Sequence, residues 1–204
     1  MEYKRKKKKK KIYYTTKILP KVFNSIKLTK SIKNELISLG AFTGDYHKFT
    51  HFSHYPYLIG FKNDYSFYDM DRSLLLFSNA LHFLKLAACK PNTKFIFAGT
   101  PLSEEKQNLF YFKQLKLNHA FFPNERWNPG AISKASRTVN FVLIVYDINL
   151  NHTAYKEGIN AKIPVVGFVT SSNDIRGLDY PILLNLKNYP MWYVKLMLAL
   201  FYKN

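Results

Sequence analysis

A run of eight consecutive cations at positions 4–11 is the feature of this sequence with the clearest chemistry. Its members are Lys4, Arg5, Lys6, Lys7, Lys8, Lys9, Lys10 and Lys11. Adjacent like charges repel one another, so this run is expected not to pack. Each phosphate that a cation neutralises releases condensed counterions, which gives an affinity for nucleic acid that depends on salt and not on sequence. We predict RNA contact by this run, with a merely solubilising tail as the alternative.

A second basic segment surrounds a tryptophan. Arg126 and Trp127 lie in a stretch rich in Pro, Gly and Asn, and Lys134 and Arg137 follow within the same segment. An Arg guanidinium can bind phosphate through two hydrogen bonds, and a tryptophan ring can stack on a base. We predict that these four residues contact RNA. Two alternatives remain open, namely packing of Trp127 beneath its own loop, which we favour for that side chain, and pairing of Arg126 with a carboxylate such as Glu125.

Three histidines, His47, His51 and His54, have spacings that would suit ligands on one helical face. The Phe, Thr, Ser and Pro residues among them disfavour a regular helix, and no carboxylate beyond Asp45 completes a ligand set. We therefore predict no metal site. The single cysteine, Cys89, excludes an internal disulfide, and its apolar neighbours predict a buried structural thiol.

One small cluster offers acid–base chemistry. Asp147, Asn149 and His152 gather at the carboxyl end of an expected strand, but helix initiation by Asp147 or Asn151 explains them more simply. The chain has neither G-x-G-x-x-G nor G-x-x-x-x-G-K-[ST], and the single glycine at Gly99 is too little to cradle phosphates. We predict no catalytic residue, no cofactor and no small-molecule substrate.

The elements that must position these residues alternate along the chain. Two apolar runs, 139–146 and 163–169, predict strands buried on both faces, and the stretch 151–162 between them has the length of a crossover helix. Further strands are predicted at 65–70, 94–99, 120–122 and 180–183. Further helices are predicted at 31–39, 73–88, 104–115 and 189–202. This alternation predicts a three-layer α/β/α fold with a mainly parallel sheet, of the Rossmann or flavodoxin-like kind.

Charge divides the chain into two parts. Lys and Arg total 31 against 13 acidic residues, a net charge of +18 over 204 residues. Residues 1–33 hold 13 of these basic residues and one acidic residue, so the remaining chain carries only +6. We predict a basic N-terminal extension over 1–33 and a single α/β domain over 34–204. No apolar run reaches the roughly 18–20 residues of a membrane span, and no membrane partner is expected.

Eight short segments, read in order, resemble one known family. They are G-A-F-T-G at 40–44, Y-L-I-G at 57–60, F-Y-D-M at 67–70, F-I-F-A-G-T at 95–100, F-P-N-E-R-W-N-P-G at 122–130, I-P-V-V-G-F-V at 163–169, T-S-S-N at 170–173 and L-D-Y-P-I at 178–182. This order resembles small-subunit ribosomal protein two, the universal S-two family, over roughly residues 36–200. The segment 122–130 resembles the family's Arg-Trp-x-Gly-Gly signature.

Departures from the family pattern are informative too. Pro129 stands in place of the first glycine of the signature. The histidine that family members usually have in the segment corresponding to 40–44 is missing. Bacterial members carry a long helical hairpin before the next strand, whereas only residues 131–140 lie there in this chain. We therefore expect the hairpin to be absent. Such divergence resembles an organellar member, for which a mitochondrial origin is favoured over a plastid one.

The resemblance implies a function in translation. It implies a structural constituent of the mitochondrial small ribosomal subunit, in the matrix, without enzymatic activity. Its expected partners are small-subunit rRNA and neighbouring ribosomal proteins, on the solvent side near the head–body junction. The alternative is a Rossmann-type nucleotide-dependent enzyme with a basic targeting tail, which would bind a nucleotide near Thr100 and Asn149. A free RNA-binding assembly factor is a weaker third hypothesis.

Overall fold

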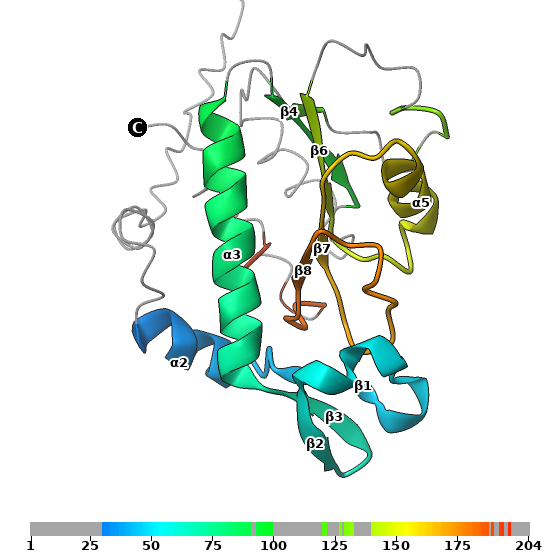
Figure 1. Cartoon of the computed structure of the whole chain (residues 1–204). Coiled ribbons are helices and arrows are strands. Elements are labelled where there is room, and N and C mark those ends of the chain that lie inside the picture. The colour runs from blue at the N-terminus through cyan, green and yellow to red at the C-terminus, as the bar shows by residue number, and fades with distance from the viewer. Residues whose placement is uncertain are drawn as a thin grey trace, which may run out of the picture.

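A five-stranded parallel sheet forms the centre of the computed structural model, which describes residues 30–90, 93–99, 120–121, 127, 129–132, 140–187, 189, 192–193 and 196. The strand order is β5-β4-β6-β7-β8 (Figure 1). The strands are β4 (Thr93–Ala98), β5 (Ala120–Phe121), β6 (Asn140–Val145), β7 (Val165–Phe168) and β8 (Tyr180–Ile182). All neighbouring pairs are parallel, which confirms the predicted α/β fold class.

Strand β6 shows why its sequence is apolar without alternation. Val142 and Ile144 pack into the core on one face of the sheet, whereas Leu143 and Val145 pack into the core on the other. Successive side chains of a strand point to opposite faces, so a strand with a core on both sides needs apolar residues throughout. The prediction from the run 139–146 is confirmed.

Two helices cover the two faces of the sheet (Figure 1). Helix α3 (Met70–Cys89) lies on one face and begins three residues earlier than predicted, because the carboxylate of Asp69 accepts hydrogen bonds from the first-turn amides of Asp71 and Arg72. Its last residue, Cys89, is exposed, so the prediction of a buried thiol is wrong. Leu86 and Ala88 face solvent near this end of the helix as Cys89 does, whereas Ala87 is buried in the core.

Helix α5 (His152–Asn160) covers the other face and contacts the sheet through a glycine. A methyl group built on Gly158 would lie 2.6 Å from Leu143 Cδ2 and 3.2 Å from Val165 Cγ2, so the helix backbone rests directly on the sheet. We expect Gly158→Ala to lower the free energy of unfolding by about 1–3 kcal/mol, because the added methyl group overpacks the core despite its better helix propensity. Chemical denaturation measures this, and a stabilised variant would contradict the close packing.

A separate three-stranded antiparallel sheet, called the antiparallel lobe, lies beneath the parallel sheet in Figure 1. It contains β1 (Thr43–Tyr46), β2 (Leu58–Lys62) and β3 (Tyr65–Tyr68), with the short 3-10 helices η1 (His47–Phe49) and η2 (Phe52–Tyr57) between β1 and β2. The strand predicted at 65–70 was expected in the parallel series, and this was wrong. Asn63 and Asp64 both have positive φ, which makes a two-residue hairpin turn and pairs β3 with β2 instead.

The chain enters the lobe through a short helix, α2 (Lys30–Ser38), which was predicted at 31–39. Gly40 follows it with φ of 64°, the left-handed conformation expected after a helix. The predicted helix 104–115, the extension 1–29 and most of 189–202 fall outside the described residues. The division of the chain at residues 33 and 34 stays a prediction. Among the described helices, none is both long and apolar enough to cross a membrane.

Candidate nucleic-acid interface

The structure describes one of the predicted RNA-binding residues, Trp127. The cationic run 4–11 lies outside the described residues, as do Arg126, Lys134 and Arg137. RNA contact by these residues therefore stays a prediction, and the described part of the segment shows how the loop is held.

Glu157 of helix α5 anchors this loop. Its carboxylate accepts a hydrogen bond from the indole Nε1 of Trp127 at 2.9 Å. It also accepts one from the amide of Gly130 at 3.0 Å and one from the amide of Ile132 at 2.9 Å. Three donors converge on one carboxylate, and hydrogen bonds to a charged acceptor are the stronger kind. The loop is thus fixed to the helix that covers the sheet.

The indole ring of Trp127 also packs against the core beside α5, where it is partly buried. This is the loop-packing arrangement that the sequence favoured for Trp127. The residue that sequence reasoning missed is Glu157, which was placed on the helix and given no role. A carboxylate 25 to 30 positions from its donors leaves no local spacing signal. The sequence did contain two separate hints. The Pro129-Gly130 turn has backbone amides that need acceptors, and Glu157 on the predicted helix is an acceptor.

The carboxyl edge of the parallel sheet is filled by the chain's own side chains. The side chain of Asn151 lies against the backbone of Gly99, where the left-handed φ of 82° and the lack of a side chain admit it. Asp147 Oδ1 accepts from the Asn149 amide at 2.9 Å, so Asp147 caps the turn that leads into α5, while the N-cap residue Asn151 makes no side-chain capping bond to the helix. Among the described residues this edge therefore offers capping contacts where nucleotides usually bind in such folds.

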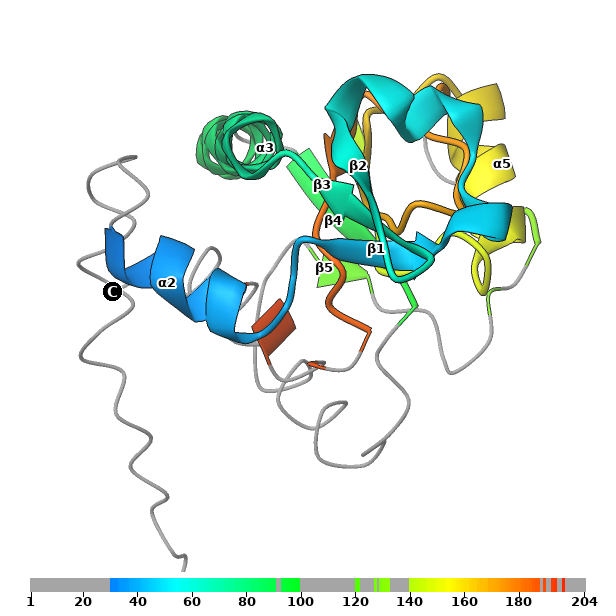
Figure 2. The same cartoon turned by 90° about the horizontal axis from the view of Figure 1, so that it is seen from below.

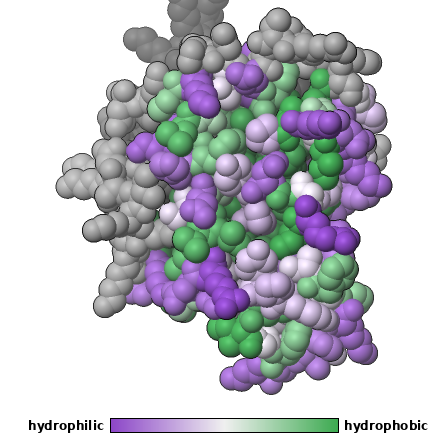
Figure 3. Space-filling view, in the orientation of Figure 1, coloured by the Kyte–Doolittle hydropathy of each residue, from purple (hydrophilic) through white to green (hydrophobic). Residues whose placement is uncertain are grey.

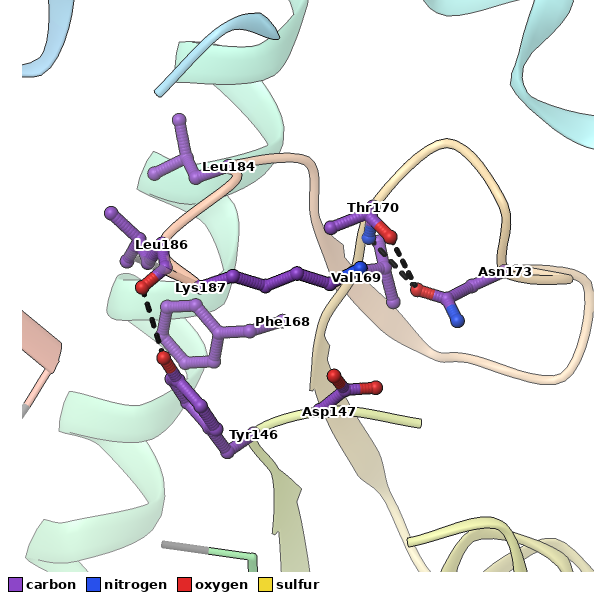
Figure 4. Close-up of a pocket in the computed structure, with 9 residues that line it drawn as sticks. All are labelled: Tyr146, Asp147, Phe168, Val169, Thr170, Asn173, Leu184, Leu186 and Lys187. Carbon is purple, nitrogen blue, oxygen red and sulfur yellow. Dashed lines mark hydrogen bonds between the residues drawn. The ribbon is translucent and has the colours of Figure 1, made fainter. Parts of the chain in front are cut away.

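A cavity of about 10 Å³ lies at this edge, between the ends of β6, β7 and β8 (Figure 4). Tyr146, Phe168 and Lys187 are among its lining residues, and the hydroxyl of Tyr146 donates to the carbonyl of Leu186 at 2.9 Å. Burial raises the pKa of Tyr146 to about 12, so its hydroxyl remains a donor at neutral pH. Small-molecule pockets usually measure about 300–1,000 Å³, so this cavity has room for about one water molecule.

The T-S-S-N turn after β7 ties the parallel sheet to the antiparallel lobe. Ser172 Oγ donates to Asp45 Oδ2 at 2.7 Å, and Ser171 Oγ accepts from the Asp45 amide at 2.7 Å. Lys187 Nζ lies 3.4 Å from Asp45 Oδ1. Burial alone would raise the pKa of Asp45, but hydrogen bonds from the turn and the Lys187 charge outweigh it and lower that pKa. These polar contacts make the lobe and the sheet one packed unit.

The three histidines of the segment 47–57 have different surroundings, and only His54 is buried among them. The segment 47–57 forms two 3-10 helices, so the three histidines do not share a regular helical face. His54 is fully buried; its Nε2 donates to the carbonyl of Asn173 at 2.8 Å, and its Nδ1 accepts from the hydroxyl of Tyr68 at 2.9 Å. The part of the chain that the structure describes holds no cluster of three or more His, Cys, Asp or Glu side chains suited to a metal ion.

The burial of His54 predicts a loss of stability in mild acid. Burial lowers the pKa of His54 below the ordinary histidine value of about 6.5, so the unfolded chain binds a proton at a higher pH than the folded chain does. The stabilisation is full above about pH 6.5 and is lost as the pH falls through the folded pKa, with a slope of up to about 1.4 kcal/mol per pH unit. Urea denaturation between pH 7.5 and 5 measures it. His54→Gln should flatten the dependence of the free energy of unfolding on pH, and His82→Gln, at an exposed histidine, should leave it unchanged. Equal slopes in both variants would contradict the assignment of this pH dependence to His54.

Comparison with curated proteins adds evidence independent of this geometry. The chain is 43% identical over 58 residues to small ribosomal subunit protein uS2 of Karelsulcia muelleri (strain GWSS). This similarity agrees with the resemblance carried by the eight segments from 40–44 to 178–182. The match covers 28% of this chain and spans about a quarter, 26%, of that relative's length. No protein-family profile matches the chain.

The similarity to a uS2 protein gives the anchored loop its context. Trp127 and Gly130 occupy two positions of the segment that resembles the uS2 signature, and both donate to Glu157. In this chain the described signature residues therefore hold the loop in place. Only residues 133–139 separate Ile132 from β6, which leaves no room for the long hairpin of bacterial uS2 proteins.

Proposed function

We propose that this chain is a structural protein of the small ribosomal subunit of a mitochondrion, where it binds small-subunit rRNA and neighbouring ribosomal proteins in translation. The observation that carries the proposal is the 43% identity to a small ribosomal subunit protein uS2. The order of the other family-like segments, from 40–44 to 178–182, supports it over the length of the α/β domain.

RNA binding in this proposal rests on two basic segments. The run 4–11 supplies eight adjacent cations for phosphates, and the loop with Arg126, Lys134 and Arg137 supplies three more. Glu157 anchors Trp127, Gly130 and Ile132, which supports a contact in this part of the chain, because anchored residues lose less conformational freedom on binding. Phosphate contacts of this kind position a protein on RNA without reading its sequence.

A structural role agrees with the filled edge of the sheet. Asn151 and Asp147 occupy the carboxyl ends of the strands with capping contacts, and the cavity beside them measures about 10 Å³. These observations give no support to the competing hypothesis of a nucleotide-dependent enzyme. We expect a thermal-shift screen across common nucleotides to leave the melting temperature unchanged. A saturable shift abolished by Asp147→Ala would favour the enzyme instead.

The mitochondrial assignment is supported by the divergence of the sequence. The segment that holds the bacterial hairpin is short, and the chain is rich in Lys, Asn, Ile, Phe and Tyr, which suits an AT-rich genome. The specific test of the RNA partner is competition binding at near-physiological salt. We expect the purified full chain to prefer small-subunit rRNA over large-subunit rRNA fragments of equal length, and equal affinity would contradict the proposed partner.

A further inference from the structure

We propose that the antiparallel lobe carries a second RNA site, which stacks unpaired bases on exposed aromatic rings. The aromatic surface, as we call it, has two parts on opposite faces of the β2–β3 hairpin. Phe49 and Tyr65 form one part and Tyr55 and Phe61 form the other, and Lys48 and Lys62 are next to these rings in the sequence. The proposed function uses cations to hold phosphates, whereas this surface would recognise single-stranded nucleotides by their faces. The inference rests on the proposed function only in taking RNA as the ligand.

The exposure of these rings is unusual. Phe49 is 68% exposed, Tyr55 54%, Tyr65 49% and Phe61 45%. Six of the twelve exposed large apolar side chains in the described part of the chain fall between residues 49 and 65. Figure 2, which views the molecule from below, shows this segment facing the viewer, and Figure 3 shows hydrophobic side chains at the lower end of the surface. Concentrated exposed apolar surface of this kind marks a binding site.

The local fold holds the rings in two groups, one on each face of the hairpin, because Phe61 pairs with Ser66 and Tyr65 pairs with Lys62 in the sheet. The amide of His47 donates to the carbonyl of Asp64 at 2.6 Å, which ties η1 to the hairpin turn. The ring of Phe61 lies 4.4 Å from that of His47 and 6.5 Å from that of Tyr55, at 82° and 85°. Each contact is edge to face, so the ring that offers its edge keeps its faces free of that contact. The rings are therefore preorganised and still open to stacking.

The second group, on the other face of the hairpin, includes a ring from strand β1. Tyr46 of β1 pairs with Tyr65 of β3 in the sheet, and their rings lie 5.9 Å apart at 90°. The ring of Phe49 lies 6.4 Å from that of Tyr46. Tyr46 thus contacts the exposed rings of both Phe49 and Tyr65, as His47 contacts Phe61 in the other group.

Charge at the border of the surface favours a polyanion. Lys48 and Lys62 are exposed, and neither forms an ion pair with another described residue. The nearby acidic residues are engaged, because Asp174 pairs with Arg176 at 2.6 Å and Asp64 accepts from the hydroxyl of Tyr46. Free cations beside aromatic faces match the backbone phosphates and bases of single-stranded RNA. Lysine is depleted at protein interfaces relative to the rest of the surface, so the two unpaired lysines beside the rings fit RNA better than a protein partner.

The test compares single-stranded and double-stranded RNA by fluorescence anisotropy. The probes are a labelled ten-nucleotide oligouridylate and a duplex of the same length, both bound to the full chain. We expect Phe49→Ala with Tyr55→Ala, and separately Phe61→Leu, to weaken binding of the single strand by about 5–50-fold. Duplex binding should change less than about twofold, because stacked bases offer no free face. The matched control is Leu75→Ala on α3, which removes an equally exposed apolar side chain elsewhere and should bind like the wild type.

Two further arms separate the failure of this proposal from that of the proposed function. With the cations of residues 4–11 replaced by Gln, the selective loss in the aromatic variants must persist, because it does not depend on the tail. Equal affinity of wild type and aromatic variants for the single strand would overturn the aromatic site and leave the tail untouched. An equal loss on single strand and duplex would overturn it as well. If the aromatic variants bind single-stranded RNA like the wild type but fail to enter small subunits, the surface binds a protein instead of RNA. Thermal melts check that each variant is folded. If the double variant is not folded, Phe61→Leu still tests the proposal, because leucine keeps most of the local packing volume.

Discussion

Replacing the eight cations at positions 4–11 with glutamine is expected to abolish most of the salt dependence of RNA binding. Each phosphate contact contributes about 0.7 to the slope of log K against log salt for single strands and about 0.9 for duplexes. Eight contacts therefore predict a loss of about 6 in the slope for single-stranded RNA. At 50 mM salt the affinity should fall by roughly a thousandfold or more, and the two proteins should converge as the salt rises.

The matched control keeps the charge and changes the chemistry. Replacing the seven lysines of this run with arginine retains all eight cations, so the slope should remain close to that of the wild type. An unchanged slope in the glutamine variant would contradict the assignment of the run as an RNA contact. A solubilising tail would then be the better interpretation.

Removal of Glu157 has the second-largest expected effect. Glu157→Ala leaves the Trp127 indole and the amides of Gly130 and Ile132 without their shared acceptor. We expect the free energy of unfolding to fall by about 2–4 kcal/mol, because each partly buried donor loses a hydrogen bond to a charged group. Glu157→Gln should lose about half of this, since one amide oxygen still accepts. Urea denaturation followed by circular dichroism measures both.

The same variant should release the loop, which a stability measurement alone does not show. In a Trp192→Phe background Trp127 is the remaining tryptophan, and its emission should shift to the red in Glu157→Ala while the protein is still folded. Lys156→Ala, on the exposed side of the same helix, is the control and should change stability by less than about 0.5 kcal/mol. An unshifted emission in the alanine variant would mean that other contacts hold the loop.

The parallel sheet could be predicted from sequence because its strands carry a strong signal. Buried strands such as 140–145 and 165–168 are continuously apolar, and the helix between them has the length that a crossover needs. The predicted bounds of α2 and β8 agree with the structure within one or two residues, which is the usual spread at element ends.

The antiparallel lobe was missed for a local reason. The turn Asn63-Asp64 reverses the chain by adopting left-handed conformations that neither residue requires, although both tolerate them. Strand β3 was therefore assigned to the wrong sheet, and the aromatic side chains around it were not predicted to form a site. The exposure of those rings follows from tertiary packing, which composition does not reveal.

The anchored loop was predictable only in part. The arginine-tryptophan segment could be recognised as a site, and the packing of Trp127 was the favoured alternative, but its partner could not be named. Glu157 is remote in sequence from the loop, and the contact exists because α5 lies over the sheet beside the end of that loop. A site assembled from separate elements needs the fold before its residues can be connected.

Sedimentation of an organellar lysate through a sucrose gradient, at moderate and then at high salt, tests the central claim most directly. Probing the fractions for this chain should show co-migration with the small ribosomal subunit that persists at high salt, because packing with neighbouring proteins would add to the charge contacts. Migration as a free protein of about 24 kDa would contradict membership of the subunit and bring the nucleotide-dependent enzyme forward.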